Sequence, residues 1–255
     1  MSDQGALRGR TMLVTGASSG IGRGIAIAAA QAGADVALTY RSNDTGARDV
    51  ASEIERLGRR AVVLHLDLAD ETRIRAIGPE ARDALGRIDA WVNNAGADIV
   101  TPAGDALPSI QKLDLLLAVD LRGTILASWE AASILQGQPD GGVIINMSWD
   151  HVLTGMEGRN PQMYSAVKGG ILSFSKSLAR SVAPKVRVNI LAPGWIETAF
   201  GANLDDERHR AVAASTPLAR WGVPDDVAGA AVFLASPAAS FMTGQMLMVG
   251  GGIVM

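Results

Sequence analysis

Short apolar runs alternate with longer helical segments along most of the chain. The apolar runs predict strands at residues 11–14, 35–40, 61–66, 90–92, 143–147, 186–191 and 246–249. Helical periodicity predicts helices at about 25–32, 45–57, 111–135 and 162–183, with a last helix that begins at Pro224. Strands separated by helices are typical of a parallel sheet covered on both faces. The pattern therefore predicts one α/β domain over residues 1–255, a doubly wound parallel sheet flanked by helices.

One stretch breaks this alternation. From residue 195 to about 223 the chain has no clear periodicity, and a charged run, Asp-Asp-Glu-Arg-His, occupies residues 205–209. A long irregular excursion from a compact domain is usually functional or disordered. We therefore expect a mobile substrate lid at about 195–223.

The composition is that of a chain that can bury one large core. Of its 255 residues, 48% are hydrophobic, and α/β domains of this length often stay undivided. The apolar segment 113–135 is interrupted by Asp114, Asp120, Arg122 and Glu130, so no membrane span is predicted. The first residues hold no basic segment followed by an apolar one. We expect a cytoplasmic protein.

Charge and residue counts narrow the class of partner. The chain has no cysteine, which excludes disulfides and thiolate metal sites. Its three histidines, His65, His151 and His209, have no partners at metal-ligand spacing, so no metal is expected. The net charge of -3 arises without a basic run, which argues against nucleic acid. A small molecule is the expected partner.

A glycine-rich turn follows the first predicted strand. Residues 15–22 read Thr-Gly-Ala-Ser-Ser-Gly-Ile-Gly and lead into an apolar helix. Glycines let a backbone approach a pyrophosphate closely, and a helix N-terminus offers free N–H groups and the positive end of its dipole. This stretch predicts a nucleotide-binding site.

The turn after the second strand bears on the choice of nucleotide. In such folds the residues at this place meet the adenine ribose, and an acid there would bind a free 2′-hydroxyl. This chain instead has Tyr40, Arg41, Ser42 and Asn43. Because Arg41 can pair with a 2′-phosphate, NADP(H) is favoured over NAD(H), which stays possible if Arg41 is only a solvated loop residue.

A candidate for proton transfer lies in the predicted helix 162–183. Tyr164 and Lys168 are four residues apart and share a helix face. A free phenol, with a pKa of about 10, is a poor base near neutrality, and a nearby cation lowers that pKa. By itself this spacing is common on solvated helices.

Together these residues resemble the short-chain dehydrogenase/reductase family over nearly the whole chain. The resemblance is carried by the glycine-rich turn 15–22, Asp67, the Asn-Asn-Ala-Gly run 93–96, the Tyr164/Lys168 pair, and Pro193-Gly194 with Thr198. The nearest likeness is to bacterial 3-oxoacyl-[acyl-carrier-protein] reductases. It implies a Rossmann-type fold, a homotetramer or homodimer, and hydride transfer between a nicotinamide cofactor and a ketone or secondary alcohol.

The resemblance also implies a role for each matching residue. Tyr164 is the implied acid or base, and Lys168 the group that binds the nicotinamide ribose and lowers the tyrosine pKa. The implied cofactor contacts are Gly16, Ala17, Ser18, Ser19, Gly20, Ile21 and Gly22 at the pyrophosphate; Asp67 and Leu68 at the adenine; Asn94, Ala95 and Gly96 beneath the ribose; and Pro193, Gly194, Ile196 and Thr198 at the nicotinamide, while Arg41 and Ser42 face the adenine ribose.

Two family positions differ. The serine that binds the substrate carbonyl is replaced by Trp149 when strands are matched, or by His151 when residues are counted back from Tyr164. The indole N–H, the imidazole or a rearranged Ser148 can each supply the donor. Asp120 stands where the family has asparagine, and its charge would stabilise the Lys168 ammonium and weaken the effect of Lys168 on Tyr164.

These differences leave two classes of function open. Because Tyr164 and Lys168 are present, an active oxidoreductase is favoured over a nucleotide-binding sensor or partner subunit with little turnover. Trp149 and Trp195 are candidate pocket walls, whereas Trp91, Trp129 and Trp221 are expected in the core or an interface. Asp150, Glu157 and Arg159 are candidates to face a polar substrate, but a solvated loop is favoured for them. Gly250 is expected to be structural, and the apolar end 246–255 to form a subunit contact.

Overall fold

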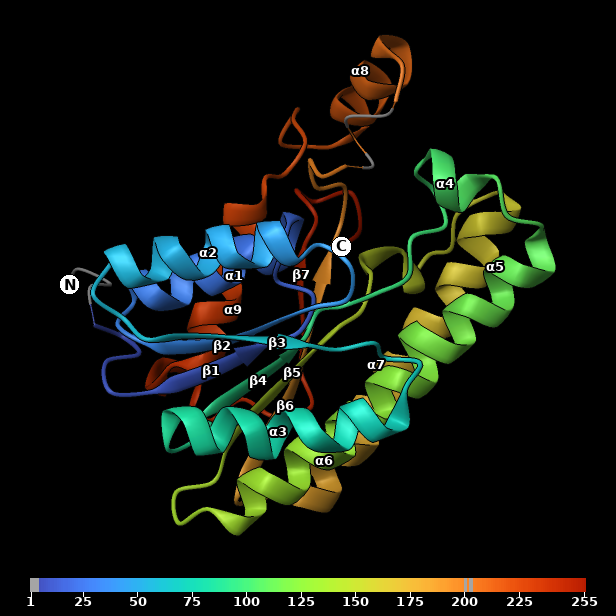
Figure 1. Cartoon of the computed structure of the whole chain (residues 1–255). Helices are drawn as coiled ribbons and strands as arrows, with labels where there is room; N and C mark the ends of the chain where they lie inside the picture. The colour runs from blue at the N-terminus through green and yellow to red at the C-terminus, as the bar shows by residue number, and fades with distance from the viewer. Residues whose placement is uncertain (1–4, 200, 202–203) are drawn as a thin grey trace.

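The computed structural model describes residues 5–199, 201 and 204–255, and it confirms the doubly wound parallel sheet (Figure 1). Seven parallel strands lie in the order β3-β2-β1-β4-β5-β6-β7. They are β1 (Thr11–Val14), β2 (Asp35–Tyr40), β3 (Ala61–His65), β4 (Ala90–Asn93), β5 (Gly142–Met147), β6 (Val186–Pro193) and β7 (Met246–Val249). The central strands read as continuous apolar runs because helices bury both faces.

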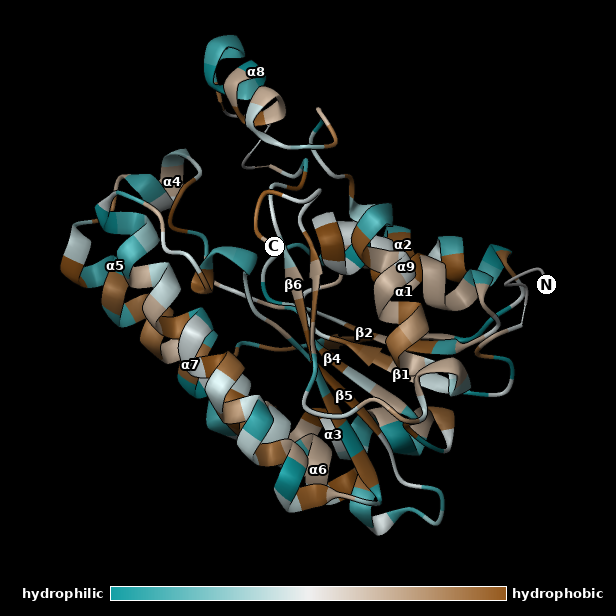
Figure 2. Cartoon of the chain, turned by 180° about the vertical axis from the view of Figure 1, so that it is seen from behind, coloured by the Kyte–Doolittle hydropathy of each residue, from teal (hydrophilic) through white to brown (hydrophobic). Residues whose placement is uncertain are grey.

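Helices cover both faces of the sheet and form two hydrophobic cores. On one face lie α1 (Gly20–Gln31), α2 (Asp44–Arg56) and α9 (Pro224–Ala235). On the other lie α3 (Glu71–Leu85), α6 (Thr124–Gly137) and α7 (Arg159–Val182). Figure 2 shows mostly hydrophobic strands between helices that carry both hydrophobic and hydrophilic residues. Each core therefore holds its helices against the sheet through apolar contact.

The order of the strands reverses between β1 and β4. From β1 the chain builds outward to β2 and β3, then returns to place β4 on the other side of β1. Ligands of open parallel sheets bind outside the carboxyl ends of the strands at such a switch point. The segments after β1, β4, β5 and β6 all lie at this edge.

Buried polar side chains tie the middle of the sheet together. Asn93 Nδ2 donates to Asn146 Oδ1 at 2.8 Å, which joins β4 to β5. Asn146 Nδ2 donates to Ser175 Oγ on α7 at 2.9 Å, and Asn93 Nδ2 also donates to Ser128 Oγ on α6. Asn94 reaches β1 by donating to the backbone oxygen of Thr15. Asparagines therefore link the ends of neighbouring strands.

Several elements differ from the predicted ones. α1 begins at Gly20 and not at residue 25, because the glycines of the turn already belong to its first turns. The predicted helix 111–135 is α5 (Ser109–Leu116) followed by a π-helical segment, Leu117–Gly123, and then α6. The short α4 (Pro102–Asp105) and the longer α3 are additional.

The irregular excursion contains a helix, α8 (Asp206–Ser215), which projects beyond the carboxyl edge of the sheet (Figure 1). The side chain of Asp205 caps it by accepting from the backbone N–H of Arg208 at 2.8 Å. The sequence of α8 has no apolar stripe, and none of its described residues is buried. In the sequence, this helix is indicated by its N-cap Asp205 and its acidic first turn, and not by hydrophobic periodicity. No helix within the described part of the chain has the length and apolarity needed to cross a membrane.

Candidate active site

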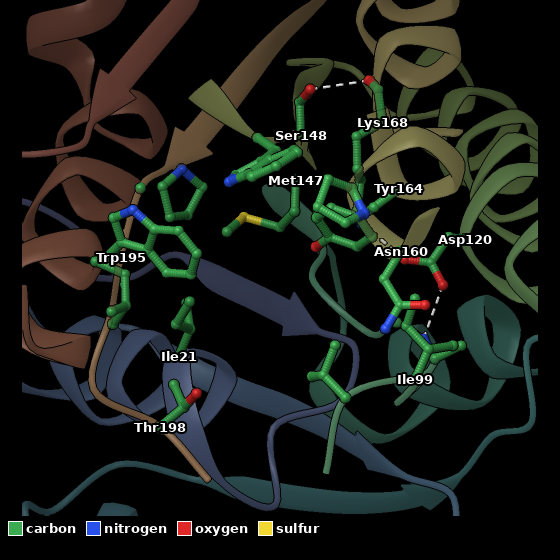
Figure 3. Close-up of a pocket in the computed structure, with 18 of the residues that line it drawn as sticks. Ile21, Ile99, Asp120, Met147, Ser148, Asn160, Tyr164, Lys168, Trp195 and Thr198 are labelled. Atoms are coloured by element: carbon green, nitrogen blue, oxygen red, sulfur yellow. Dashed lines mark hydrogen bonds and ion pairs between the residues drawn. The ribbon is translucent and has the colours of Figure 1, made fainter. Parts of the chain in front are cut away.

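A cavity of about 500 Å³ opens at the carboxyl edge of the sheet. It gathers residues from the turn after β1, the segments after β4, β5 and β6, and the start of α7. Its walls are Ile21, Asn94, Gly96, Ala97, Ile99, Val100, Asp120, Met147, Ser148, Trp149, Met156, Asn160, Pro161, Tyr164, Lys168, Pro193, Gly194, Trp195, Ile196 and Thr198. Figure 3 shows Asn160, Tyr164 and Asp120 on one side, facing Ile21, Trp195 and Thr198 on the other.

Tyr164 and Lys168 lie side by side on α7, as their spacing predicts. The Lys168 Nζ is 5.4 Å from the centre of the Tyr164 ring, and both side chains line the cavity. Burial raises the pKa of Tyr164, the Lys168 ammonium opposes that rise, and the Asp120 carboxylate adds to it. The net result is a phenol that keeps its proton near neutrality.

Asp120 pairs directly with Lys168 inside the protein. Its Oδ1 lies 2.9 Å from Lys168 Nζ, and the two side chains are 1% and 4% exposed. Its Oδ2 accepts from the backbone N–H of Ala97 at 2.7 Å. Burial alone would lower the pKa of Lys168, but the Asp120 carboxylate and the Tyr164 oxygen raise it above its ordinary value. Lys168 is therefore a fixed cation, as the sequence led us to expect from Asp120.

The residues at the end of β5 meet the cavity in different ways. Ser148 Oγ donates to the backbone oxygen of Lys168 at 2.9 Å and is buried (Figure 3). Trp149 also lines the cavity, and its ring meets the Tyr164 ring edge to face at 5.3 Å. Both tryptophans expected to be pocket walls, Trp149 and Trp195, lie there.

Asp150 and His151 form a buried pair behind this wall. The reading of Asp150 as a solvated residue is wrong, because its side chain is fully buried. Asp150 Oδ1 lies 2.7 Å from His151 Nδ1, and the His151 ring stacks on Trp149 with centroids 4.8 Å apart. Burial raises the pKa of Asp150, and the hydrogen bond to His151 opposes the rise. Glu157 and Arg159 are exposed, as expected.

Gly250 makes room for the Asp150 carboxylate. A methyl group at Gly250 would overlap Asp150 Oδ2, and one at Gly194 would lie 2.6 Å from the same atom. That oxygen has no hydrogen-bond partner among the described residues. Gly250 therefore has a structural role, as expected. Because it has no side chain, it leaves space for the Asp150 carboxylate at the end of β5.

The glycine-rich turn has the shape that a dinucleotide pyrophosphate requires. Gly16 has φ +65°, and a Cβ on it would lie 2.8 Å from the Ala95 Cα. Asn94 Nδ2 holds the turn by donating to the backbone oxygen of Gly16 at 3.1 Å. A Cβ on Gly20 would be 3.6 Å from the Thr198 methyl, so the turn and the segment after β6 face each other. These residues fit a nicotinamide dinucleotide.

The residues expected around the adenine lie beside the turn after β2. Arg41 and Ser42 are exposed, and the backbone oxygen of Arg41 is 2.9 Å from His65 Nε2. Asp67 Oδ1 accepts from the backbone N–H of Ala69, and Leu68 is buried. The Arg41 guanidinium is therefore open to a charged group in solution.

The expected lid is joined to the cavity by aromatic contacts. Trp195 meets Trp221 at 5.7 Å, and Trp221 stacks on His209 of α8 at 4.9 Å. His209 Nε2 also pairs with Glu197 Oε2 at 2.7 Å. Trp221 and Trp91 are buried as expected, whereas Trp129 is 55% exposed and lies outside the core. α8 is therefore linked to the cavity wall through His209, Trp221 and Trp195.

Sequence reasoning missed some of the lining residues. Asn160 precedes Tyr164 by four positions and so shares its helix face, a signal that was available. Ile99, Val100 and Met156 belong to irregular segments, where no periodicity indicates which side chains face inward.

Fold and site together define a nicotinamide-nucleotide-dependent oxidoreductase: a glycine turn lies at the switch point, and a tyrosine–lysine pair faces it across a cavity. A family model described as enoyl-(acyl carrier protein) reductase matches residues 16–254. The chain belongs to the short-chain dehydrogenase/reductase family, as the sequence motifs predict, and it is an NAD(P)-dependent oxidoreductase.

Relatives of known name cover nearly the whole chain. The chain is 38% identical over 251 residues to the L-rhamnose 1-dehydrogenase (NAD(P)(+)) of Sphingomonas sp. strain SKA58, with 97% of both covered. It is 37% identical over 256 residues to a 3-oxoacyl-[acyl-carrier-protein] reductase of Synechocystis, covering 98% of this chain and 99% of the relative. A 7α-hydroxysteroid dehydrogenase, complexed with NADH and 7-oxo glycochenodeoxycholic acid, has a similar structure, with a TM-score of 0.89, 33% identity, and coverage of 100% and 98%.

Proposed function

We propose that this chain reduces an uncharged, largely apolar ketone with NADPH, and oxidises the corresponding secondary alcohol in the reverse direction. The observation that carries the proposal is the cavity wall, where two indoles, Trp149 and Trp195, face the catalytic tyrosine together with aliphatic side chains. Apolar walls favour apolar substrates because they remove apolar surface from water.

The charges in the cavity support the same class of substrate. Among the described residues that line it, the charged ones are Asp120 and Lys168, which pair with each other. An anionic group on the substrate would find no free cation there to offset its loss of hydration. A 3-oxoacyl thioester, the kind of substrate named for one relative, fits if its ketone end enters and its carrier stays outside.

The chain's own residues would handle the proton. A bound nicotinamide supplies the hydride. Tyr164 Oη gives its proton to the carbonyl oxygen as the hydride reaches the carbonyl carbon, so that C=O becomes CH–OH. The Lys168 ammonium stabilises the phenolate that remains. Asn94, Gly96, Thr198 and the glycine turn would hold the cofactor, with the contacts implied by the family motifs.

Substitution of Tyr164 tests the proton step. Tyr164→Phe is expected to lower kcat for ketone reduction by at least about 10²-fold, because general acid catalysis contributes that much or more. NADPH affinity, measured by fluorescence titration, is expected to change little. Wild-type turnover is measured on β-keto esters, aryl ketones, quinones and keto sugars. Unchanged turnover in the variant would contradict the role of Tyr164.

A nucleotide-binding sensor is the second candidate, and the observation that favours it is the absence of the family serine at the carbonyl. Turnover on the panel of carbonyl compounds distinguishes the sensor from the reductase. If the wild-type protein binds NADPH but oxidises it with none of these carbonyls, the sensor is supported and the reductase is not.

The preference for NADPH rests on Arg41. Its exposed guanidinium would pair with a 2′-phosphate, and its charge already contributes to the lowered pKa of Asp98. Arg41→Ala is expected to weaken NADPH binding about tenfold or more and NADH binding much less, since only the 2′-phosphate contact is lost. Equal losses for the two nucleotides would refute this role. Arg23→Ala, at an exposed arginine of α1 paired with Glu53, is the matched control.

The remaining expectations belong to the same proposal. We infer a cytoplasmic homotetramer or homodimer in which residues 195–223, of which 200, 202 and 203 lie outside the described part of the chain, close over the bound substrate. The aromatic contacts of Trp221 with Trp195 and His209 support the lid, because they link α8 to the cavity wall.

A further inference from the structure

A ketone held by Tyr164 needs a second hydrogen-bond donor at its oxygen, since one phenol alone stabilises the developing charge incompletely. The segment 148–151, at the end of β5, carries three side chains able to donate: Ser148, Trp149 and His151. The surroundings of these three side chains show which of them can donate to a substrate. This inference rests on the ketone reduction proposed above.

Ser148 is already engaged. Its hydroxyl proton is used in the 2.9 Å bond to the backbone oxygen of Lys168, and the residue is 4% exposed. That bond fixes the end of β5 to α7. Turning the hydroxyl toward the cavity would break this buried hydrogen bond between the end of β5 and α7, which is unfavourable.

His151 lies behind Trp149. Its Nδ1 is held by Asp150, and its ring is stacked between indoles, parallel to Trp149 at 4.8 Å and edge-on to Trp195 at 6.0 Å. It is not among the residues that line the cavity. Trp149 in turn contacts the Tyr164 ring at 5.3 Å. The indole therefore separates the imidazole from the tyrosine.

Trp149 is the group that remains. It lines the cavity. No described residue accepts a hydrogen bond from its Nε1, and this atom is not buried. We propose that the Trp149 indole N–H donates a hydrogen bond to the substrate carbonyl oxygen, in the role that a serine hydroxyl has elsewhere in the family.

Asp150 and His151 act as positioning residues for that indole. Asp150 is fully buried, it fixes His151 through both the ring Nδ1 and the backbone N–H at 2.7 Å each, and the space for its second oxygen comes from Gly194 and Gly250. The imidazole held in this way is the flat surface against which Trp149 stacks. The two residues reach the substrate only through Trp149.

The test begins with Trp149→Phe, which keeps an aromatic ring on His151 and removes the N–H. It is expected to lower kcat for ketone reduction by about 10²-fold, the loss typical of one such donor. NADPH affinity is expected to stay the same, and the primary isotope effect with deuterated NADPH to rise, because hydride transfer becomes slower than product release. Trp129→Phe, the same change at the half-exposed Trp129 outside the cavity, is the control and is expected to match the wild type.

A double-mutant cycle tests the positioning role. Asp150→Asn keeps the size of the side chain and is expected to lower kcat several-fold in the wild type but to add little in Trp149→Phe, since both changes act on one donor. Additive losses would mean that Asp150 serves stability alone. Wild-type kcat in Trp149→Phe, with Tyr164→Phe inactive, would overturn the proposal for Trp149 only. A wild-type protein that reduces no ketone would overturn the proposed function, and this role with it.

Discussion

At the scale of single residues, Asp120 affects the pKa of Tyr164, the proposed proton donor. An uncharged asparagine at this place would leave the full charge of Lys168 to act on Tyr164. Here the carboxylate lies 2.9 Å from the ammonium and neutralises much of that charge. The tyrosine therefore keeps a raised pKa, to which burial contributes most and Asp120 also contributes. A tyrosine that stays protonated is suited to giving a proton, which is the step that reduction requires.

This arrangement predicts the effect of removing one charge. Burial still raises the pKa of Tyr164 in Asp120→Asn, but the carboxylate charge that adds to this rise is lost, so that pKa falls. Reduction needs protonated Tyr164, so its kcat/KM declines as pH rises through this pKa, and the decline is expected at lower pH in the variant. The measurement is the pH profile of kcat/KM for ketone reduction. A decline that stays in place or moves to higher pH would show that Asp120 does not act on Tyr164. Asp105→Asn, an exposed carboxylate paired with Lys112 outside the cavity, is the control.

At the scale of elements, the polar links between β4, β5 and α7 hold the site in register. Asn146 is fully buried and joins Asn93 on β4 to Ser175 on α7, the helix that carries Tyr164. An apolar residue in its place leaves buried polar groups without partners. The strand ends and the helix that carries Tyr164 are therefore stabilised by the same few hydrogen bonds.

Substitution at Asn146 measures this contribution. Asn146→Leu is expected to lower the free energy of unfolding by about 2–3 kcal/mol, since the amide of Asn93 and the hydroxyl of Ser175 lose a partner. Urea denaturation followed by circular dichroism gives the value. Asn160→Leu, the same change at a half-buried residue, is expected to cost less. Equal losses at both positions would argue against a special role for the network.

The accuracy with which the sequence predicts the fold differs between the strands and the helices. The strands of the sheet could be placed within a residue or two, because most of them are short apolar runs and the central ones are buried on both faces. α8 could not be placed, since it buries none of its described residues. The π-helical segment that contains Asp120 is only seven residues long and lies between two α-helices, too short for its different periodicity to be recognised in the sequence. In the site, motif spacing predicts Tyr164 and Lys168 on one face. The pairing of Asp150 with His151 depends on space left by Gly194 and Gly250, which only the three-dimensional structure shows.

At the scale of the whole molecule, apolar side chains remain exposed near the edge strand β7. Phe241 and Met255 are almost completely exposed, and Phe233 on α9 is 39% exposed. Large apolar groups that stay in water are typical of surfaces that other chains cover. We propose that the subunit contact expected at the apolar end 246–255 also includes Phe241.

The mass in solution tests this expectation. Light scattering after size-exclusion chromatography is expected to give two or four times the 26.5 kDa of one chain. Phe241→Ser is expected to shift the equilibrium toward smaller species, because it removes apolar area from the contact. Leu57→Ser, at an exposed apolar residue that ends α2, serves as the control. A monomeric wild-type protein would contradict the assembly.

The two indoles in the cavity wall also make the protein its own optical probe. Trp149 and Trp195 lie beside the place where a reduced nicotinamide would bind, and reduced nicotinamide absorbs light in the range where indole emits. Energy transfer from these two tryptophans would report occupancy, while the half-exposed Trp129 supplies a more constant background. Cofactor exchange can thus be followed in real time in the unlabelled protein, with Trp149→Phe and Trp195→Phe separating the contributions of the two indoles.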